Sequence, residues 1–201
     1  MEGSFAVYAV PTLLFLAQLL CFTNGFPIYE EQNKEYIKTS CTNTTYPRLC
    51  YKSLSTYASK INGDPKLLAT TALNVTYIST QSTSKLMKRI SRIHNLRPRV
   101  AAAVADCVEV LGDSVDELQR SIEEMGRAGG GPSFGIVMND IETWVSAALT
   151  DDDTCMDGFG GKAMKGRVKM LVRKNILRVS RLTSNALALV NNYASSQAAL
   201  A

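Results

Sequence analysis

Apolar residues recur every three or four positions over long stretches of the chain, which is the pattern of amphipathic helices. The most regular stripe lies in the last segment and comprises Val168, Val172, Asn175, Val179, Leu182, Ala186, Leu189 and Tyr193. A second stripe lies between Pro98 and Met125 and comprises Val104, Val108, Leu111, Val115, Leu118, Ile122 and Met125. No stretch shows the strict alternation or the Asn-Gly turns of strands, so the pattern predicts an all-α fold.

Two further helices complete the pattern. Asp64 and Pro65 are typical of a helix start, because an acidic side chain caps free N–H groups and proline fits the first turn. The expected inward face of this helix comprises Leu68, Ala72, Val75, Ser82, Leu86 and Ile93. A shorter helix is expected from about Phe134 to Leu149, with an inward face of Val137, Ile141, Trp144 and Ala148. Four such helices with short links favour an antiparallel up-down-up-down four-helix bundle over 63–201.

The first 62 residues are expected to divide into a leader and a small helical unit. The run from Phe5 to Phe22 is almost wholly apolar and small residues follow it, which is typical of a signal peptide over 1–25. The same run is also long enough to serve as a short membrane anchor. The remaining 26–201 is expected to form one exported domain, in which 26–62 makes an N-terminal helical hairpin on the bundle.

Four cysteines remain behind the leader: Cys41, Cys50, Cys107 and Cys155. An even number in an exported chain indicates two disulfides, whereas a metal site would need a two-residue cysteine spacing or histidine partners. The spacing suggests a ten-residue disulfide loop from Cys41 to Cys50. Cys107, within a predicted helix, and Cys155, expected just past the end of another, would tie neighbouring helices together.

Charge and sequons add modest information. Asn43 and Asn74 begin Asn-X-Thr sequons and are therefore candidate glycosylation sites, which should lie on the surface. The chain has 22 Lys and Arg against 18 Asp and Glu, one of them in the leader, so the exported chain carries a formal charge of +5. The basic residues are spread over several segments without interleaved aromatics, which argues against nucleic acid as a partner. Weak attraction to an acidic polysaccharide is compatible with this charge.

The sequence shows no catalytic constellation. His94 is the only histidine, and no nucleophile-elbow sequence or Cys-His context accompanies it. Asp151, Asp152, Asp153 and Asp157 precede or flank Gly158, but their spacing does not match a calcium loop, and they are interpreted as a charged, solvated turn. We expect no cofactor, no metal and no enzymatic activity.

The chain resembles the plant invertase and pectin methylesterase inhibitor family. The matching stretches are Cys41–Cys50, Ala105–Glu109, Thr143–Thr150, Thr154–Phe159 and Leu182–Leu189, and together they span most of the exported chain. The resemblance implies a four-helix bundle with an N-terminal helical hairpin and the disulfides Cys41–Cys50 and Cys107–Cys155. It also implies a non-catalytic protein that inhibits a carbohydrate-processing enzyme.

The target enzyme follows from the branch of the family that the chain resembles. Invertase-inhibiting members tend to carry a Pro-Lys-Phe motif, and here Ser133 stands between Pro132 and Phe134, so the charged lysine is missing. The run Thr143–Thr150 looks like the pectin methylesterase branch. That branch implies a one-to-one complex in the apoplast that covers the substrate cleft, with an invertase as the alternative target.

The same resemblance implies which residues contact the enzyme. An acidic row after the third cysteine matches Glu109, Asp113 and Asp116, and Thr154 matches another contact position. Spacings of four and three place the three acids on one helix face, opposite Leu111 and Leu118. Two hypotheses from other classes remain: a structural wall protein that binds pectin itself, and a small secreted enzyme, which the missing nucleophile–base pair disfavours.

Overall fold

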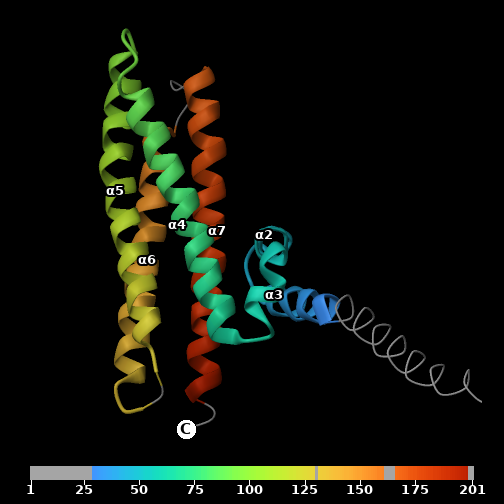
Figure 1. The fold of residues 1–201 in the computed structure, drawn as a ribbon. Helices are drawn as coiled ribbons and strands as arrows, with labels where there is room; N and C mark the ends of the chain where they lie inside the picture. Colours follow the sequence, from blue (N-terminus) through green and yellow to red (C-terminus); the bar gives the residue numbers. More distant parts are fainter. Residues whose placement is uncertain (1–28, 130, 161–165, 199–201) are drawn as a thin grey trace, which may run out of the picture.

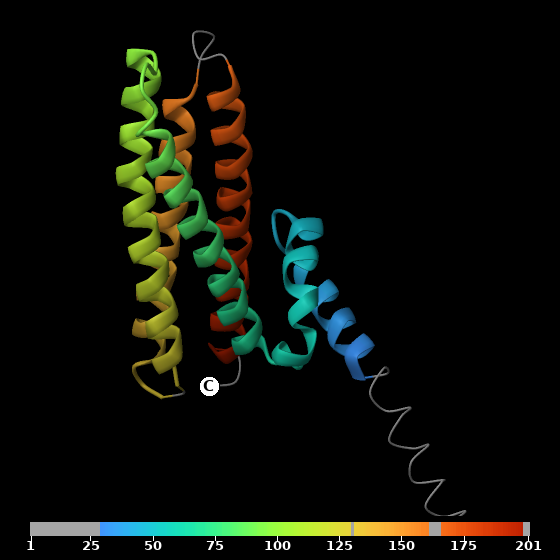
Figure 2. The ribbon, with the colours of Figure 1, turned by 45° about the horizontal axis from the view of Figure 1, so that its top comes forward.

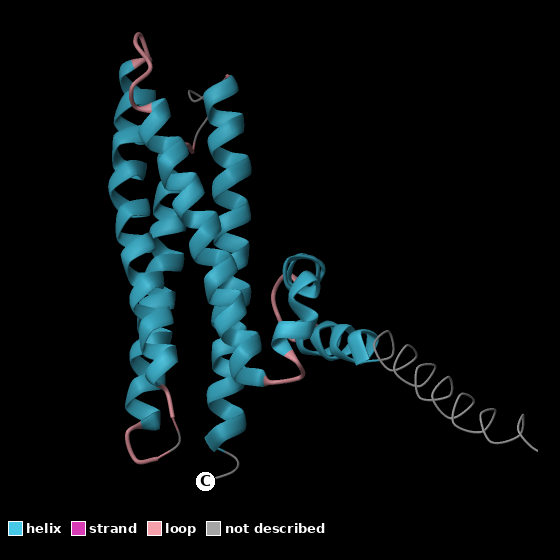
Figure 3. Cartoon of the chain, in the orientation of Figure 1, coloured by secondary structure: helices cyan, strands magenta, loops and turns pink. Residues whose placement is uncertain are grey.

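The computed structural model describes residues 29–129, 131–160 and 166–198 of the chain, and these are almost entirely helical (Figure 3). No strand occurs in that part of the chain. The predicted signal peptide over 1–25, including Cys21, lies outside the described residues. None of the described helices is both long and apolar enough to span a lipid bilayer.

Four long helices form the body of the molecule (Figure 1). They are α4 (Pro65–Ile90), α5 (Pro98–Arg127), α6 (Phe134–Gly158) and α7 (Arg167–Ala198). Each helix packs against the next one in the chain, and α7 closes the ring by packing against α4. Figures 1 and 2 show the four helices side by side with alternating direction. The predicted all-α, antiparallel four-helix bundle is confirmed.

The predicted signals set the start of the first long helix. The Asp64 carboxylate accepts a hydrogen bond of 2.9 Å from the Leu67 N–H, and Pro65 occupies the first turn of α4. Both features satisfy or remove N–H groups that the start of a helix leaves without partners. Pro98 plays the same part at the start of α5.

The structure corrects the end of the fourth predicted element. Helix α6 does not end near Leu149 but continues to Gly158, so Cys155 lies within it and Asp152 is fully buried. The interpretation of 151–153 as a solvated turn was therefore wrong. Ala148, Asp152 and Cys155 follow one another at spacings of four and three, so they extend one inward face of α6. The same face carries Met138 and Val145, whereas Val137 and Trp144 are only half-buried.

The inward face of α4 also differs from the prediction, since Ser82 and Ile93 are exposed and Ile93 lies beyond the helix. Four threonines of α4, including Thr71, lie inside instead. The hydroxyl groups of the other three donate to the carbonyl oxygen four residues earlier, at 2.8 Å for Thr76, 3.0 Å for Thr80 and 2.9 Å for Thr83. A hydroxyl group that is satisfied within its own helix is tolerated in the core. Because these threonines are polar, the pattern of apolar residues did not identify the buried face of α4.

The N-terminal hairpin packs on the lower part of the bundle. It consists of a helical segment over 29–41, α2 (Pro47–Leu54), η1 (Ser55–Tyr57) and α3 (Ala58–Ile61). Ile37, Leu54 and Ile61 are buried in the same apolar cluster as Leu68 of α4 and Leu189 of α7. The hairpin is therefore part of the hydrophobic core, as well as projecting beside the bundle (Figure 2).

The four cysteines form the two disulfides that the family resemblance implied. Cys41–Cys50 closes the hairpin loop with its Cα atoms 5.7 Å apart, and Cys107–Cys155 joins α5 to α6 with its Cα atoms 4.6 Å apart. All four residues are buried. Each bridge restricts the unfolded chain and is expected to stabilise the fold by about 2–4 kcal/mol.

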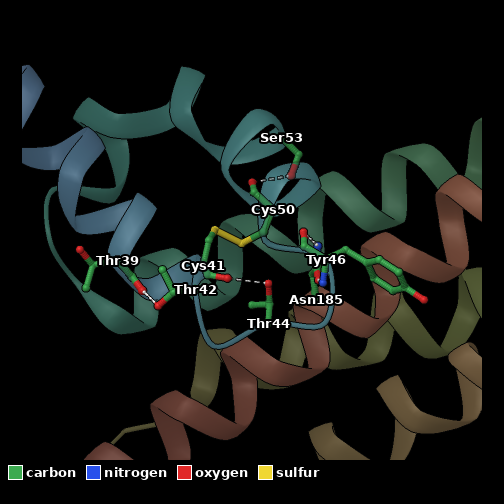
Figure 4. The surroundings of a disulfide bond; sticks show 8 residues. All are labelled: Thr39, Cys41, Thr42, Thr44, Tyr46, Cys50, Ser53 and Asn185. Carbon is green, nitrogen blue, oxygen red and sulfur yellow. Dashed lines mark hydrogen bonds between the residues drawn. A yellow bond between two sulfur atoms is a disulfide. The ribbon is translucent and has the colours of Figure 1, made fainter.

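Asn185 of α7 ties the disulfide loop to the bundle (Figure 4). Its Oδ1 accepts from the Tyr46 N–H at 3.0 Å, and its Nδ2 donates to the Tyr46 carbonyl oxygen at 3.1 Å. The Asn185 side chain is buried, so both hydrogen bonds are partly shielded from water. The side-chain amide thus satisfies both backbone polar groups of Tyr46.

We expect Asn185→Ala to lower the free energy of unfolding by about 1–3 kcal/mol, because both Tyr46 backbone groups lose their partner. Hydrogen exchange at 43–48 should speed up as the loop detaches. Asn192→Ala, at an exposed position of the same helix, is the matched control. Equal urea-unfolding midpoints for the two variants would show that the amide does not hold the loop.

Candidate partner-binding surface

The charges of the bundle are divided between two pairs of helices. Helices α5 and α6 contain most of the acidic residues, and α6 contains no Lys or Arg. Helices α4 and α7 contain many basic residues and no Asp or Glu. Because α5 packs on α6 and α4 packs on α7 (Figure 1), the two sides of the bundle differ in the sign of their charge. We refer to α5 and α6 as the acidic half and to α4 and α7 as the basic half.

The predicted acidic row lies on the outer face of α5. Glu109, Asp113 and Asp116 are all exposed, whereas Leu111 and Leu118 on the opposite face are fully buried. The salt bridges formed by described residues leave all three acids unpaired with Lys or Arg. The row is therefore a solvated set of carboxylates on one rigid helix, open to a partner of opposite charge.

Thr154 lies on α6, close to the same row. Its side chain is exposed, and its hydroxyl group donates to the Thr150 carbonyl oxygen at 2.8 Å. Thr154 precedes Cys155, and Glu109 follows Cys107 by two residues, so the buried disulfide links the segments that carry both. The bridge fixes the distance between the two predicted contact elements.

A carboxyl pair between α5 and α6 extends the acidic row inward. Glu117 and Asp151 are both half-buried. Burial, and next the neighbouring Asp151, raise the pKa of Glu117 to about 7, and Asp113 acts in the same direction. Burial likewise raises the pKa of Asp151. The pair titrates as a unit and holds a proton up to near neutral pH.

Asp152 lies directly beneath this surface and contacts two other helices. Its Oδ2 lies 2.7 Å from the Thr183 hydroxyl oxygen of α7, and its Oδ1 lies 3.4 Å from the Ser114 hydroxyl oxygen of α5. Burial raises the pKa of Asp152 to about 8, although both hydroxyl groups act in the opposite direction. The carboxyl group is therefore largely neutral at pH 7. The Thr183 hydroxyl group, which donates to Asp152, also lies 3.1 Å from the Val179 carbonyl oxygen.

The sequence analysis did not predict that these carboxyl groups are buried between helices, where Glu117 lies beside Asp151 and Asp152 bonds to Thr183. The spacing of Ala148, Asp152 and Cys155 could have indicated that Asp152 lies on the inward face of α6. Among the described residues, no group of three or more Asp, Glu, His or Cys side chains is arranged to hold a metal ion. His94 is exposed.

The two sequons occupy different surroundings. Asn43 is exposed in the loop closed by Cys41–Cys50. Asn74 is half-buried in α4, its Nδ2 donates to the Thr70 carbonyl oxygen at 2.8 Å, and Thr76 of the same sequon is buried. Because Nδ2 is the atom that carries an N-linked glycan, the structure favours Asn43 over Asn74 as an acceptor.

The segment that bears on the choice of target lies at the start of α6. Ser133 is exposed and precedes the helix. Phe134 is half-buried, and its ring packs edge-on against the ring of Tyr193, with centroids 5.7 Å apart. This position therefore offers a neutral hydroxyl group beside an aromatic ring that is already packed against α7.

The chain is similar to plant inhibitor proteins. A family model described as plant invertase/pectin methylesterase inhibitor matches residues 35–189. Pectinesterase inhibitor 10 of Arabidopsis thaliana is 54% identical over 169 residues, which cover 83% of this chain and 54% of that protein. This chain thus spans about half the length of that relative.

A second relative matches over nearly its whole length. The 21 kDa protein of Daucus carota is 50% identical over 185 residues, which cover 91% of this chain and 94% of that protein. The fold is also that of a solved structure, mutant form A of a pectin methylesterase inhibitor from Arabidopsis. The two agree with a TM-score of 0.64 at 24% identity, over 77% of this chain and 95% of that one.

We expect the stability of the protein to fall as pH rises from about 5 to 8, in part because of Asp152. The folded state holds its proton up to about pH 8, whereas the unfolded chain releases it near the ordinary pKa of 3.8. The stabilisation from this raised pKa is therefore complete below about pH 4 and is lost as pH approaches 8. Asp152→Asn should flatten the dependence of the melting temperature on pH.

The matched control is Asp157→Asn, at an exposed position of the same helix, which should keep the wild-type slope. Parallel melting curves for wild type and Asp152→Asn across pH 5 to 8 would contradict the assignment of this slope to Asp152.

Proposed function

The chain belongs to the plant invertase/pectin methylesterase inhibitor family, and we propose that it is a secreted inhibitor of pectin methylesterase. Several of its relatives are named pectinesterase inhibitors, so the chain is an inhibitor-family protein rather than an enzyme. In this proposal it covers the substrate cleft of the esterase in a non-covalent, one-to-one complex. Inhibition then controls the degree of methylesterification of cell-wall pectin.

The exposed acidic row is the observation that carries the proposal. Glu109, Asp113 and Asp116 project from one face of α5, and Thr154 projects from the adjoining α6. Rigid, solvated carboxylates attract a partner with a basic rim and fix its orientation. Because the acids lie on helices held together by a disulfide, little conformational entropy is lost when they bind. The protein blocks the cleft by its bulk, and no covalent step is needed.

The proposed setting is the apoplast. A signal peptide over 1–25 would direct export, and two buried disulfides are typical of proteins that fold in an oxidising compartment. Asn43 is the proposed glycosylation site, with Asn74 as the less accessible second sequon. The positive net charge also supports weak contact with acidic pectin.

The esterase is favoured over an invertase as the target by the start of α6. Invertase-inhibiting relatives are expected to insert a charged lysine there, but Ser133 is neutral and Phe134 already packs on Tyr193. Titration of the oxidised chain into both enzymes tests this choice. We expect esterase activity to be lost near one equivalent and invertase activity to persist. Loss of invertase activity alone would show that the target is wrong.

We expect the triple variant Glu109→Gln, Asp113→Asn, Asp116→Asn to raise the inhibition constant for the esterase at least tenfold. The variant removes three charges from the contact face while keeping the size of each side chain, and exposed substitutions of this kind leave the fold intact. Inhibition assays with circular dichroism as a check on folding measure the effect.

A control with the same net charge is Glu30→Gln, Glu31→Gln, Glu35→Gln on the N-terminal helical segment, where all three acids are exposed. It should inhibit like the wild type. If both triple variants changed the inhibition constant equally, overall charge rather than the acidic row would account for the effect.

A further inference from the structure

The basic half of the bundle has a surface that the proposed inhibition does not use. No Asp or Glu occurs in α2, η1, α3, α4 or α7. Basic residues, by contrast, occur in both α4 and α7 and also in α2 and α3. Where α4 and α7 face each other, neither helix therefore contributes a carboxylate to the surface.

A shallow groove of about 360 Å³ runs between α4 and α7 on this side. From α4 it is lined by Ile78, which is 58% exposed, and by Ser82. From α7 it is lined by Asn175 and Arg178, and Tyr57 of η1, 38% exposed, also lines it. The groove thus combines a cation, amide and hydroxyl groups, and exposed apolar surface.

Further cations continue this groove along both helices. Lys85 and Arg89 follow Ser82 on α4 at spacings of three and four, and Lys174 precedes Arg178 on α7 by four. Residues at these spacings share one helix face, and all four basic side chains are exposed. The cations on each helix are therefore about 6 Å apart along its axis, given a rise of 1.5 Å per residue.

A second hollow of about 300 Å³ lies between the N-terminal hairpin and α7. It is lined by Tyr46, Arg48 and Arg181, among others. The Arg181 guanidinium lies 5.2 Å from the centre of the Tyr46 ring, so the ring holds the cation in a fixed place. Since Asn185 fixes the Tyr46 backbone to α7, this pair is part of the rigid body of the protein.

We propose that this basic groove, defined by Lys85, Arg89, Lys174, Arg178 and Arg181, binds an acidic polysaccharide of the de-esterified pectin type. A linear polyuronate carries a carboxylate on each sugar ring, so it matches cations repeated along a groove. The faces of its rings are apolar, and Ile78, Tyr57 and Tyr46 offer exposed apolar and aromatic surface for them. Fully methyl-esterified pectin has the same rings without the charges and binds weakly.

The choice of this polymer rests on the proposed function, because removal of methyl esters by the target enzyme produces it. The groove is lined mainly by α4 and α7, whereas the acidic row lies on α5. The inhibitor can thus hold the product polymer and the enzyme at the same time. Binding to the product would concentrate the inhibitor where the esterase has already acted.

The test is binding of the oxidised chain to immobilised polygalacturonate at several salt concentrations. The quadruple variant Lys85→Gln, Arg89→Gln, Lys174→Gln, Arg178→Gln should bind at least tenfold more weakly and show a smaller dependence on salt, since fewer counterions are released. The matched control removes four cations elsewhere: Lys34→Gln, Lys38→Gln, Arg120→Gln and Arg127→Gln. It has the same net charge and should bind like the wild type.

Three results would overturn the inference. Equal binding by the two quadruple variants would mean that net charge alone attracts the polymer. Equal affinity for fully methyl-esterified pectin would remove the role of the carboxylates. Equal affinity for double-stranded DNA at the same salt would mean that the groove does not select a polyuronate.

Esterase inhibition, assayed in parallel, separates this inference from the proposed function. The groove variant should inhibit the esterase like the wild type, because the acidic row is intact. Inhibition without selective polygalacturonate binding would refute the groove alone. Selective polygalacturonate binding without inhibition of any esterase would refute the proposed function and leave a pectin-binding wall protein.

Discussion

A single buried carboxyl group constrains how three of the four long helices pack. Asp152 belongs to α6, and its two oxygens lie against hydroxyl groups of α5 and α7. A buried carboxyl group without such partners would cost several kcal/mol, so a rotation or slip of any of the three helices is penalised. An apolar contact tolerates small shifts, but these hydrogen bonds do not. The register of the acidic half therefore depends on Asp152, Ser114 and Thr183.

Polar residues of α7 also fix the position of the hairpin through hydrogen bonds. Thr183, Ser184 and Asn185 are consecutive, and each one reaches a different place: Asp152 of α6, the Thr45 hydroxyl group, and the Tyr46 backbone. The threonines of α4 behave differently, since their hydroxyl groups bond within their own helix and impose no register. The same residue types thus specify the fold in α7 and act as small core residues in α4. A short polar stretch in a long helix can therefore fix the positions of neighbouring segments more precisely than the apolar stripe around it.

Hydrophobic periodicity predicted the four long helices, and the cysteine count predicted two bridges. The apolar stripes of α5 and α7 were regular enough to place their inward faces, with Leu111, Leu118, Val179 and Leu189 buried as expected. The method failed where polar side chains lie inside, at Asp152 and at the α4 threonines, because a pattern of apolar residues cannot show that a polar group has a partner. The exposed row of Glu109, Asp113 and Asp116 was predictable as a helix face, but the buried carboxyl groups beside it depend on contacts between helices.

The division of charge between the two halves is compatible with a stable bundle because the core, and not ion pairing, holds the helices together. The salt bridges Lys34–Glu30, Lys38–Glu35 and Arg127–Glu124 each stay within one helical segment and are largely exposed, so they add little stability. Charges that do not cross-link the helices remain solvated, and a partner can engage them at a small desolvation cost. Mixing the signs over the surface would stabilise the bundle only slightly and would weaken the attraction that each half exerts. Because the interior already fixes the arrangement of the helices, the exterior is free to present one charge to a protein and the opposite charge to a polymer.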